Sequence, residues 1–368
     1  MDPWIVWGSE LSPFTLKVIR LHRHAGVPIR FLPAQGGFLE NWKYALRVEQ
    51  LKRGRLPLTW PQMTEDDEFP LVPFVFGPRG ENLYDSTAIA PWLDRELPES
   101  RRTIPSDESA AFIARLIDDY ADEFLLYVVH HNRWVLSASD NDAGKRVARE
   151  YRFLAGPFQG AWGNWFAKRQ TKRLPYLFST PQTRKLLDDS FVRLLDILET
   201  LLAKRAFILG ERFTLADAAI YGQLGMNLAD PSADRLMRTR APVTHRWLTA
   251  LHGSAAQPIP SGSSLQIDSA LKPLLAEIFR THVPLMQQNL AAHQRFKQAG
   301  ARRFNEGAFN RGEAMYDGEL DGHRFRHVAK SFQARVWCDC LAHWSRLSPS
   351  ARRKVEGLLP AQRLALAA

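Results

Sequence analysis

Along residues 4–32 the spacing of apolar positions changes from that of a strand to that of a helix and back to that of a strand. Residues 4–7 are a continuous apolar run, which predicts a short buried strand. Apolar positions then recur every three or four residues as far as Gly26, which predicts an amphipathic helix that ends at a glycine. Residues 27–32 predict a second strand, so the chain begins with a β-α-β unit. The helix positions that share one face are Phe14, Val18, Leu21 and Ala25.

The turn between this strand and this helix carries a candidate functional group. Ser12 can accept hydrogen bonds from backbone N–H groups of the first helical turn, and Pro13 suits the first helical position because it has no N–H to lose. The hydroxyl of Ser12 sits at the positive end of the helix dipole, where an anion such as a thiolate is favoured. Helix capping alone is the alternative interpretation of Ser12.

Apolar spacing weakens between residues 36 and 69, where residues 39–46 indicate a short helix and the remainder predicts a loop. Residues 69–77 predict a strand, followed by a turn, a short strand and a helix that includes residues 89–93. Pro73 inside the predicted strand requires either an edge position or a cis peptide bond before it.

Asp85 and Ser86 stand directly before that helix. A carboxylate, a hydroxyl and free backbone N–H groups converge there and can bind the charged end of a ligand. Helix capping without a ligand is again the alternative interpretation.

The next part of the chain predicts helices only. Residues 98–110 are polar and contain prolines, which indicates a linker, and a long helix with apolar positions over residues 112–128 follows. Residues 137–182 predict irregular helices, and residues 183–201 a regular one. Beyond it, Thr214 and Asp217 form a capping box before a buried helix. Acidic residues gather on the other side of the long helix: Asp118, Asp119, Asp122 and Glu123.

The segment after residue 253 begins with Gly, Ser and Pro and then predicts helices again. Its last helix carries one apolar stripe, so Cys340 is expected in the core. Residues 317–322 imitate the start of a calcium loop, but Val328 takes the place of the final Glu and a turn is the better interpretation. The stripe consists of Phe325, Val328, Phe332, Val336, Cys340 and Trp344.

Composition narrows the class of protein. Of 368 residues, 45% are hydrophobic and 24% are charged, which is typical of a soluble globular protein. No apolar run approaches the roughly 20 residues of a membrane span, and no leader peptide precedes the first strand, so we expect a cytoplasmic protein. The two cysteines, Cys338 and Cys340, point apart on a helix and predict no disulfide and no zinc site.

The net charge of +10 is concentrated late in the chain, with sixteen Lys and Arg against nine Asp and Glu after residue 254. Such a region could attract nucleic acid or anionic lipid, but the charges are scattered, and a solvated face is the preferred interpretation. Lys17 is likewise interpreted as a solvated helix residue. The sequence has no G-x-S-x-G elbow, no P-loop and no G-x-G-x-x-G after a strand, which removes the commonest signatures of hydrolases and nucleotide-binding proteins.

Four segments together resemble a cytosolic glutathione transferase: SPFTLKV at 12–18, VPFV at 72–75, YDSTAIAPWL at 84–93 and FILGERFTLADAAIY at 207–221. The resemblance covers about residues 1–253 and is greatest to the serine-type and bacterial β-etherase-like branches. It implies an α/β thioredoxin-like domain at 1–97 and an all-α domain at 106–253. The extra helical extension at 254–368 departs from the family pattern. The resemblance also implies a homodimer, no metal and a role in detoxification.

The resemblance implies a role for each matching residue. Ser12 would donate a hydrogen bond to the glutathione sulfur and lower the pKa of the thiol, with Thr15 as a second candidate hydroxyl. Val72, followed by a cis Pro73, would pair with the cysteinyl part of glutathione. At the γ-glutamyl end, Ser86 would bind the carboxylate and Asp85 would face the amino group.

The residues that bind the glycine carboxylate would lie in an insertion between Ser12 and Pro73. The candidate cations there are Lys43, Lys52, Arg53 and Arg55, of which Lys52 and Arg55 are preferred. The walls for the second substrate would include Tyr120, Phe124 and Tyr127, although aromatic residues at helical spacing are more often plain core.

The predicted function is transfer of the glutathione thiolate to an electrophilic carbon of a small hydrophobic, including aromatic, substrate. Reductase chemistry is disfavoured because position 12 is not a cysteine. The alternative is a glutathione-binding scaffold that has lost turnover, and nucleic-acid binding through the extension is the weakest candidate.

Overall fold

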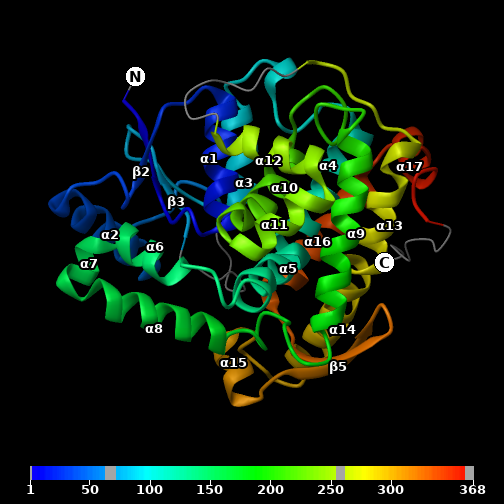
Figure 1. Ribbon diagram of the computed structural model, residues 1–368. Coiled ribbons are helices and arrows are strands. Elements are labelled where there is room, and N and C mark those ends of the chain that lie inside the picture. Colours follow the sequence, from blue (N-terminus) through cyan, green and yellow to red (C-terminus); the bar gives the residue numbers. More distant parts are fainter. Residues whose placement is uncertain (1, 63–71, 254–261, 361–368) are drawn as a thin grey trace.

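The computed structural model describes residues 2–62, 72–253 and 262–360. Its N-terminal part is a four-stranded sheet in the order β2-β1-β3-β4, in which β1 and β2 are parallel and β3 and β4 are antiparallel to their neighbours (Figure 1). The predicted thioredoxin-like domain is therefore confirmed. The strands are β1 (Trp4–Trp7), β2 (Ile29–Leu32), β3 (Phe74–Phe76) and β4 (Asn82–Tyr84); the helices are α1 (Pro13–Ala25), α2 (Phe38–Lys52) and α3 (Ser86–Asp94).

Side chains alternate across this sheet as the two-residue period of a strand requires. Val6, Val75 and Leu83 belong to the core formed with α1 and α3. Trp7 and Phe76 point to the opposite face, where Val48 and Leu51 of α2 cover them. The sheet is thus buried on both faces.

Three local expectations need correction. The second strand begins at Ile29, two residues later than predicted, and α2 is a full helix of fifteen residues where mostly loop was expected. The predicted strand at 69–77 is a strand only over Phe74–Phe76, and residues 69–71 of it lie outside the described residues. The peptide bond between Val72 and Pro73 is cis, which is one of the two arrangements that the sequence left open.

The second part is all helical, as predicted. A long helix runs without interruption from α4 to η3, and the capping box of Thr214 and Asp217 is formed. The segment interpreted as irregular helices is an arm, α6 to α8, that passes beside α2 (Figure 1). The elements are η1 (Glu99–Arg101), α4 (Glu108–Tyr120), η2 (Ala121–Leu125), α5 (Leu126–His131), η3 (Asn132–Leu136), α6 (Ala143–Glu150), α7 (Arg152–Ala155), η4 (Gly156–Phe158), α8 (Gln159–Lys172), α9 (Arg184–Leu202), α10 (Leu215–Met226), η5 (Asn227–Ala229), α11 (Pro231–Arg240) and α12 (Pro242–Gly253).

The extension packs on the helical part, with α13 against α9 and both α16 and α17 against α4. One hydrophobic core runs through both, and Cys340 is part of it, as predicted. The domain limits at residues 97 and 253 stay predictions. The extension contains η6 (Ser269–Leu271), α13 (Lys272–Arg280), α14 (His282–Gln298), α15 (Glu306–Arg311), β5 (Met315–Leu320), β6 (His323–Val328), α16 (Ser331–Arg346) and α17 (Pro349–Glu356).

A β-hairpin in the extension contradicts the all-helical expectation. Strands β5 and β6 pair in register from Met315 with Val328 to Leu320 with His323. Asp321 and Gly322 between them both have positive φ angles, 48° and 77°, which a two-residue hairpin turn requires. Phe325 and Val328 therefore belong to β6 and not to the last helix, which begins at Ser331.

None of the helices in the described ranges combines the length and the apolar character that crossing a membrane requires. Within the same ranges, no cluster of His, Cys, Asp and Glu side chains is arranged to hold a metal ion.

Candidate functional site

One large cavity, with a volume of about 1420 Å³, lies where the N-terminal sheet, the long helix, the arm and the extension meet. The edge of the sheet contributes the turns before α1 and α3. The long helix contributes one face from Ala111 to Trp134, and α16 contributes one face from Phe332 to His343. Six of the eight residues preferred for the glutathione site line this cavity: Ser12, Lys52, Val72, Pro73, Asp85 and Ser86.

Ser12 is both a helix cap and a cavity residue. Its hydroxyl oxygen accepts a hydrogen bond from the backbone N–H of Thr15 at 3.4 Å. Thr15 itself is fully buried, and its hydroxyl is packed so closely against Gly8 that a Cβ atom there would lie 2.4 Å from it. Thr15 does not line the cavity, whereas Ser12 does. Ser9 of the same loop also lines the cavity, but its hydroxyl donates a hydrogen bond to Glu150.

Among the four candidate cations of the insertion, only Lys52 lines the cavity. Its ammonium lies 4.0 Å from a carboxylate oxygen of Glu49, and burial lowers the pKa of Lys52. Arg53 pairs with the same Glu49 at 3.5 Å, and Arg55 is exposed away from the cavity. Lys43 lies over the ring of Tyr44. The geometry thus favours Lys52 for an anionic ligand group.

Asp85 and Ser86 begin α3 as predicted, with Asp85 at a positive φ angle of 69°. One oxygen of Asp85 accepts hydrogen bonds from the backbone N–H groups of Thr87 at 2.9 Å and Ala88 at 3.3 Å. The other oxygen lies 3.8 Å from the guanidinium of Arg335, which comes from α16 of the extension. The extension therefore places a cation at the end of the cavity where the γ-glutamyl group was predicted.

Arg335 was not predicted as a site residue. Its guanidinium also lies 3.6 Å from Asp339, one helical turn further on, and over the ring of Phe332 at 4.8 Å. An Arg and an Asp at this spacing were visible in the sequence. That α16 returns to the turn before α3, some 250 residues earlier in the chain, was not.

Lys17 is not solvated, contrary to expectation. Its side chain is 1% exposed, and its ammonium lies 2.5 Å from Asp118 and 2.6 Å from Asp122. The hydroxyl of Thr87 joins the group, accepting from Lys17 at 2.9 Å and donating to Asp118 at 2.8 Å. Burial disfavours the ammonium, but the two carboxylates raise the pKa of Lys17 above its usual range. This buried cluster fastens α1 and α3 to the long helix.

The acidic side of the long helix forms part of the cavity wall instead of facing solvent. Burial raises the pKa of Asp119 to about 7, of Asp122 to about 6 and of Glu123 to about 8. Arg115 at 2.7 Å opposes the shift of Asp119, and Lys17 opposes that of Asp122. Asp119 and Glu123 titrate close to neutral pH, and Lys17 balances the charge of Asp122. The wall therefore repels an anionic ligand less than its three acidic residues would suggest.

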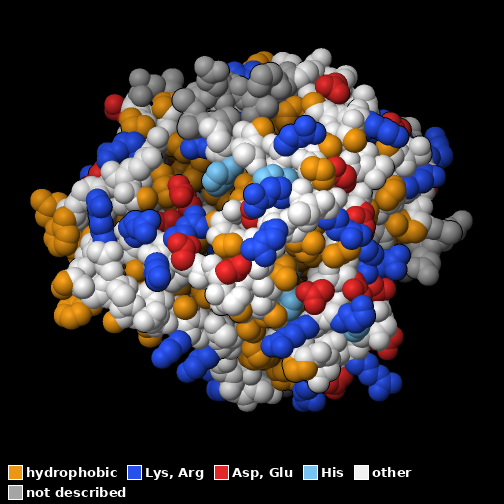
Figure 2. Space-filling view, in the orientation of Figure 1, with side chains coloured by type: hydrophobic (Ala, Val, Ile, Leu, Met, Phe, Trp, Pro, Cys, Tyr) orange, Lys and Arg blue, Asp and Glu red, His pale blue; other side chains and the backbone are white. Residues whose placement is uncertain are grey.

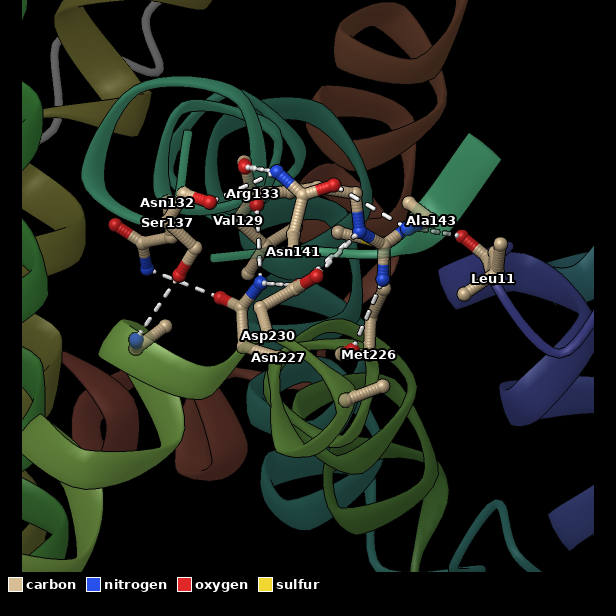
Figure 3. Close-up of polar contacts among 12 residues, drawn as sticks. Leu11, Val129, Asn132, Arg133, Ser137, Asn141, Ala143, Met226, Asn227 and Asp230 are labelled. Atoms are coloured by element: carbon tan, nitrogen blue, oxygen red, sulfur yellow. Dashed lines mark hydrogen bonds and ion pairs between the residues drawn. The ribbon is translucent and has the colours of Figure 1, made fainter. Parts of the chain in front are cut away.

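A second buried network holds the loop that leads into Ser12 (Figure 3). Arg133 of η3 donates to the carbonyl of Leu11 at 2.8 Å and to that of Met226 at 3.0 Å. The same guanidinium pairs with Asp230 at 2.8 Å, and Asn227 donates to Asp230 at 2.8 Å. Arg133 is therefore a positioning residue for the Ser12 turn. The sequence did not indicate it, since its partners lie more than 90 residues away.

Of the two interpretations of the aromatic residues on the long helix, substrate wall or plain core, the structure supports plain core. Tyr120, Phe124 and Tyr127 are buried core residues and do not line the cavity. The aromatic wall comes from the arm and from the end of the long helix instead: Trp134, Tyr151, Trp162, Trp165 and Phe166.

Residues 181–250 match the family model described as glutathione S-transferase, C-terminal domain. No curated protein matches the sequence significantly. Similar solved structures include a glutathione S-transferase from Methylobacillus flagellatus with glutathione bound (17% identity, 69% of this chain and 96% of that chain, TM-score 0.37). A glutathione transferase family member from Pseudomonas fluorescens has two glutathione molecules bound (15% identity, 69% and 91%, TM-score 0.39). A glutathione transferase from Burkholderia graminis has two per subunit (18% identity, 69% and 85%, TM-score 0.39).

Proposed function

We propose that this protein is a glutathione transferase. It binds glutathione along the edge of the sheet, ionises the thiol beside Ser12 and transfers the thiolate to an electrophilic carbon of a small hydrophobic substrate, aromatic substrates included. A carbon–sulfur bond forms, the thiol proton passes to solvent, and the electron pair goes either into the conjugated substrate or to a leaving group such as an aryl oxide.

One observation carries this proposal. Residues from three separate motifs, at positions 12, 72–73 and 85–86, line one cavity, although nothing in their local sequence brings them together. The match of residues 181–250 to a glutathione S-transferase domain supports it independently of the cavity.

Each end of glutathione then has a partner in the chain. The thiol lies at Ser12, and Val72 with Pro73 holds the cysteinyl backbone. Lys52 binds the glycine carboxylate, and Ser86 with the N-terminus of α3 binds the γ-glutamyl carboxylate. Asp85 faces the amino group. The proposal further includes the serine-type or β-etherase-like branch, a homodimer, a cytoplasmic location and a role in detoxification.

The direct test measures thiolate formation. The protein should be retained on immobilised glutathione, and bound glutathione should show the ultraviolet absorbance of a thiolate at a pH where free glutathione does not. Retention without the thiolate signal would favour the glutathione-binding scaffold over the enzyme. Absence of retention would refute both.

Arg335 gives a prediction about the γ-glutamyl end. Arg335→Gln should weaken glutathione binding about 10-fold or more, because it removes a hydrogen bond from the guanidinium to the γ-glutamyl carboxylate. A hydrogen bond to a charged group contributes roughly 1.5–3 kcal/mol. Binding of cysteinylglycine, which lacks the γ-glutamyl group, should change little. Both affinities can be measured by titration calorimetry.

Arg346→Gln is the matched control, since Arg346 is exposed on the same helix and does not line the cavity. Equal losses for glutathione and cysteinylglycine in Arg335→Gln would show that Arg335 supports the fold of the site and does not bind the γ-glutamyl group.

A further inference from the structure

Seven of the eight large hydrophobic side chains that are exposed among the described residues lie at one end of the molecule. They belong to α2 and to the arm from α7 to α8 and are between 39% and 81% exposed. The ring of Trp42 lies edge-on to Phe153 at 5.6 Å, so the two elements form one surface. We call this surface the apolar face; its residues are Phe38, Leu39, Trp42, Leu46, Leu154, Phe158 and Trp165.

The arm that forms one side of the apolar face is strongly basic. Residues 143–172 contain seven Lys and Arg and a single acidic residue, Glu150. Glu150 accepts hydrogen bonds from Ser9 and from the backbone N–H of Glu10, and burial raises its pKa to about 7, so it contributes little negative charge. Figure 2 shows hydrophobic side chains at the left edge of the molecule, over α2 and α7, with Lys and Arg side chains beside them. The exposed cations of the arm are Lys145, Arg149, Arg152, Lys168 and Lys172.

We propose that the apolar face docks on the surface of an anionic phospholipid bilayer. Trp, Phe and Leu side chains next to Lys and Arg are the groups that enter the headgroup region of a membrane and are attracted to anionic lipids. A soluble surface rarely leaves so many large apolar side chains together without a partner.

Charge decides between a bilayer and a second copy of this chain as the partner. A symmetric contact would bring the same patch of both copies together and place the cations of one arm against those of the other. An anionic surface offers the charge opposite to that of the arm and needs no matching shape. The exposed apolar side chains of α2 and α7 protrude, so they suit insertion into a bilayer better than binding in a groove of a partner protein.

The apolar face and the cavity share part of their lining. Trp42, Leu46, Leu154 and Trp165 belong to the apolar face and also line the cavity. When the face is docked, the cavity opens next to the bilayer, and an apolar ligand can pass between lipid and protein without crossing water.

Vesicle co-sedimentation of the full chain tests the proposal. We expect binding to vesicles of equal parts phosphatidylglycerol and phosphatidylcholine at low salt, weaker binding at high salt, and little binding to pure phosphatidylcholine. Lys168→Glu with Lys172→Glu should lower binding at least about 25-fold, since each cation near an anionic surface contributes about fivefold. Leu39→Ser with Phe158→Ser should lower it roughly tenfold or more.

Matched controls lie elsewhere on the surface. Arg302→Glu with Arg303→Glu makes the same charge change at exposed positions of the extension. Leu136→Ser alters the exposed large hydrophobic residue that, within the described ranges, lies outside the apolar face. Failure of the unaltered chain to bind anionic vesicles would overturn the proposal, as would equal losses in arm and control variants. So would a dimer in sedimentation that Leu39→Ser with Phe158→Ser converts to a monomer. None of these outcomes depends on glutathione.

Discussion

Replacing Lys17 with methionine should lower the free energy of unfolding by about 3–5 kcal/mol, the usual loss when one partner of a buried ion pair is removed. Methionine fills a similar volume, so the loss comes from charge and not from a cavity. Asp118 and Asp122 would keep their buried positions without the ammonium that lies 2.5 Å and 2.6 Å from them. Chemical denaturation at neutral pH measures the change.

The loss of stability in Lys17→Met should also depend on pH, and the pKa of Asp122 decides whether the loss grows or shrinks as pH rises. Burial already raises the pKa of Asp122 to about 6 with Lys17 in place, and Lys17 opposes this shift. Without Lys17 the pKa rises further, so the folded variant keeps a proton that the unfolded chain releases near pH 4. A raised carboxyl pKa makes stability fall as pH rises through this window. Lys17→Met should therefore lose less stability at pH 5 than at pH 8.

Lys185→Met is the matched control, because Lys185 pairs with Asp189 at 2.8 Å on the surface, where its side chain is 73% exposed. That change should cost less than about 1 kcal/mol. Adding Asp122→Asn to Lys17→Met should recover part of the loss. A loss that is equal at pH 5 and pH 8 would mean that the cluster does not carry the charges assigned to it.

The same cluster shows where prediction from sequence stops. The spacing of apolar residues predicted the β-α-β start, and the cap at Ser12 and the capping box at Thr214 and Asp217 formed as expected, since local residues decide each of them. From the sequence of their own helices alone, Lys17 and Asp122 are each interpreted as a charge on the surface. Burial became visible only when two segments more than 100 residues apart were placed together.

The extension and the arm were predictable only in part, for related reasons. The spacing of Phe325 and Val328 fits the stripe of the following helix, but the positive φ angles at Asp321 and Gly322 reverse the chain and make them part of a strand. Apolar residues at helical spacing also do not reveal which of them stay exposed. The stripe of α2 therefore predicted a short helix, and not that Leu39 would be 81% exposed.

The candidate site was predictable where motifs are short and local, and not where distant segments complete it. Ser12, Asp85 and Ser86 sit at helix starts that the sequence marks by itself. Arg335 and Arg133 reach the same cavity from the extension and from the long helix, and no local signal indicates their partners. Folding decides these contacts because they join segments that only the tertiary packing brings together.

Ser12→Ala should slow turnover about 10²–10³-fold, the usual loss when one preorganised donor to a developing or bound anion is removed. The pKa of bound glutathione should rise by roughly 1–2 units, because the thiolate loses a charge-assisted hydrogen bond and the neutral thiol does not. Glutathione affinity should change less than about threefold, since the thiol contributes little to ground-state binding. Steady-state rates, the pH dependence of thiolate absorbance and calorimetry measure the three quantities.

Ser348→Ala provides the control that separates catalysis from helix capping. Ser348 caps α17 by accepting from the backbone N–H of Ala351 at 3.3 Å, as Ser12 caps α1, but it does not line the cavity. Both changes should cost about 1 kcal/mol of stability, and only Ser12→Ala should alter the thiol pKa. If Thr15→Val raises that pKa and Ser12→Ala does not, the sulfur lies against Thr15, and the turn must open at Gly8 to admit it.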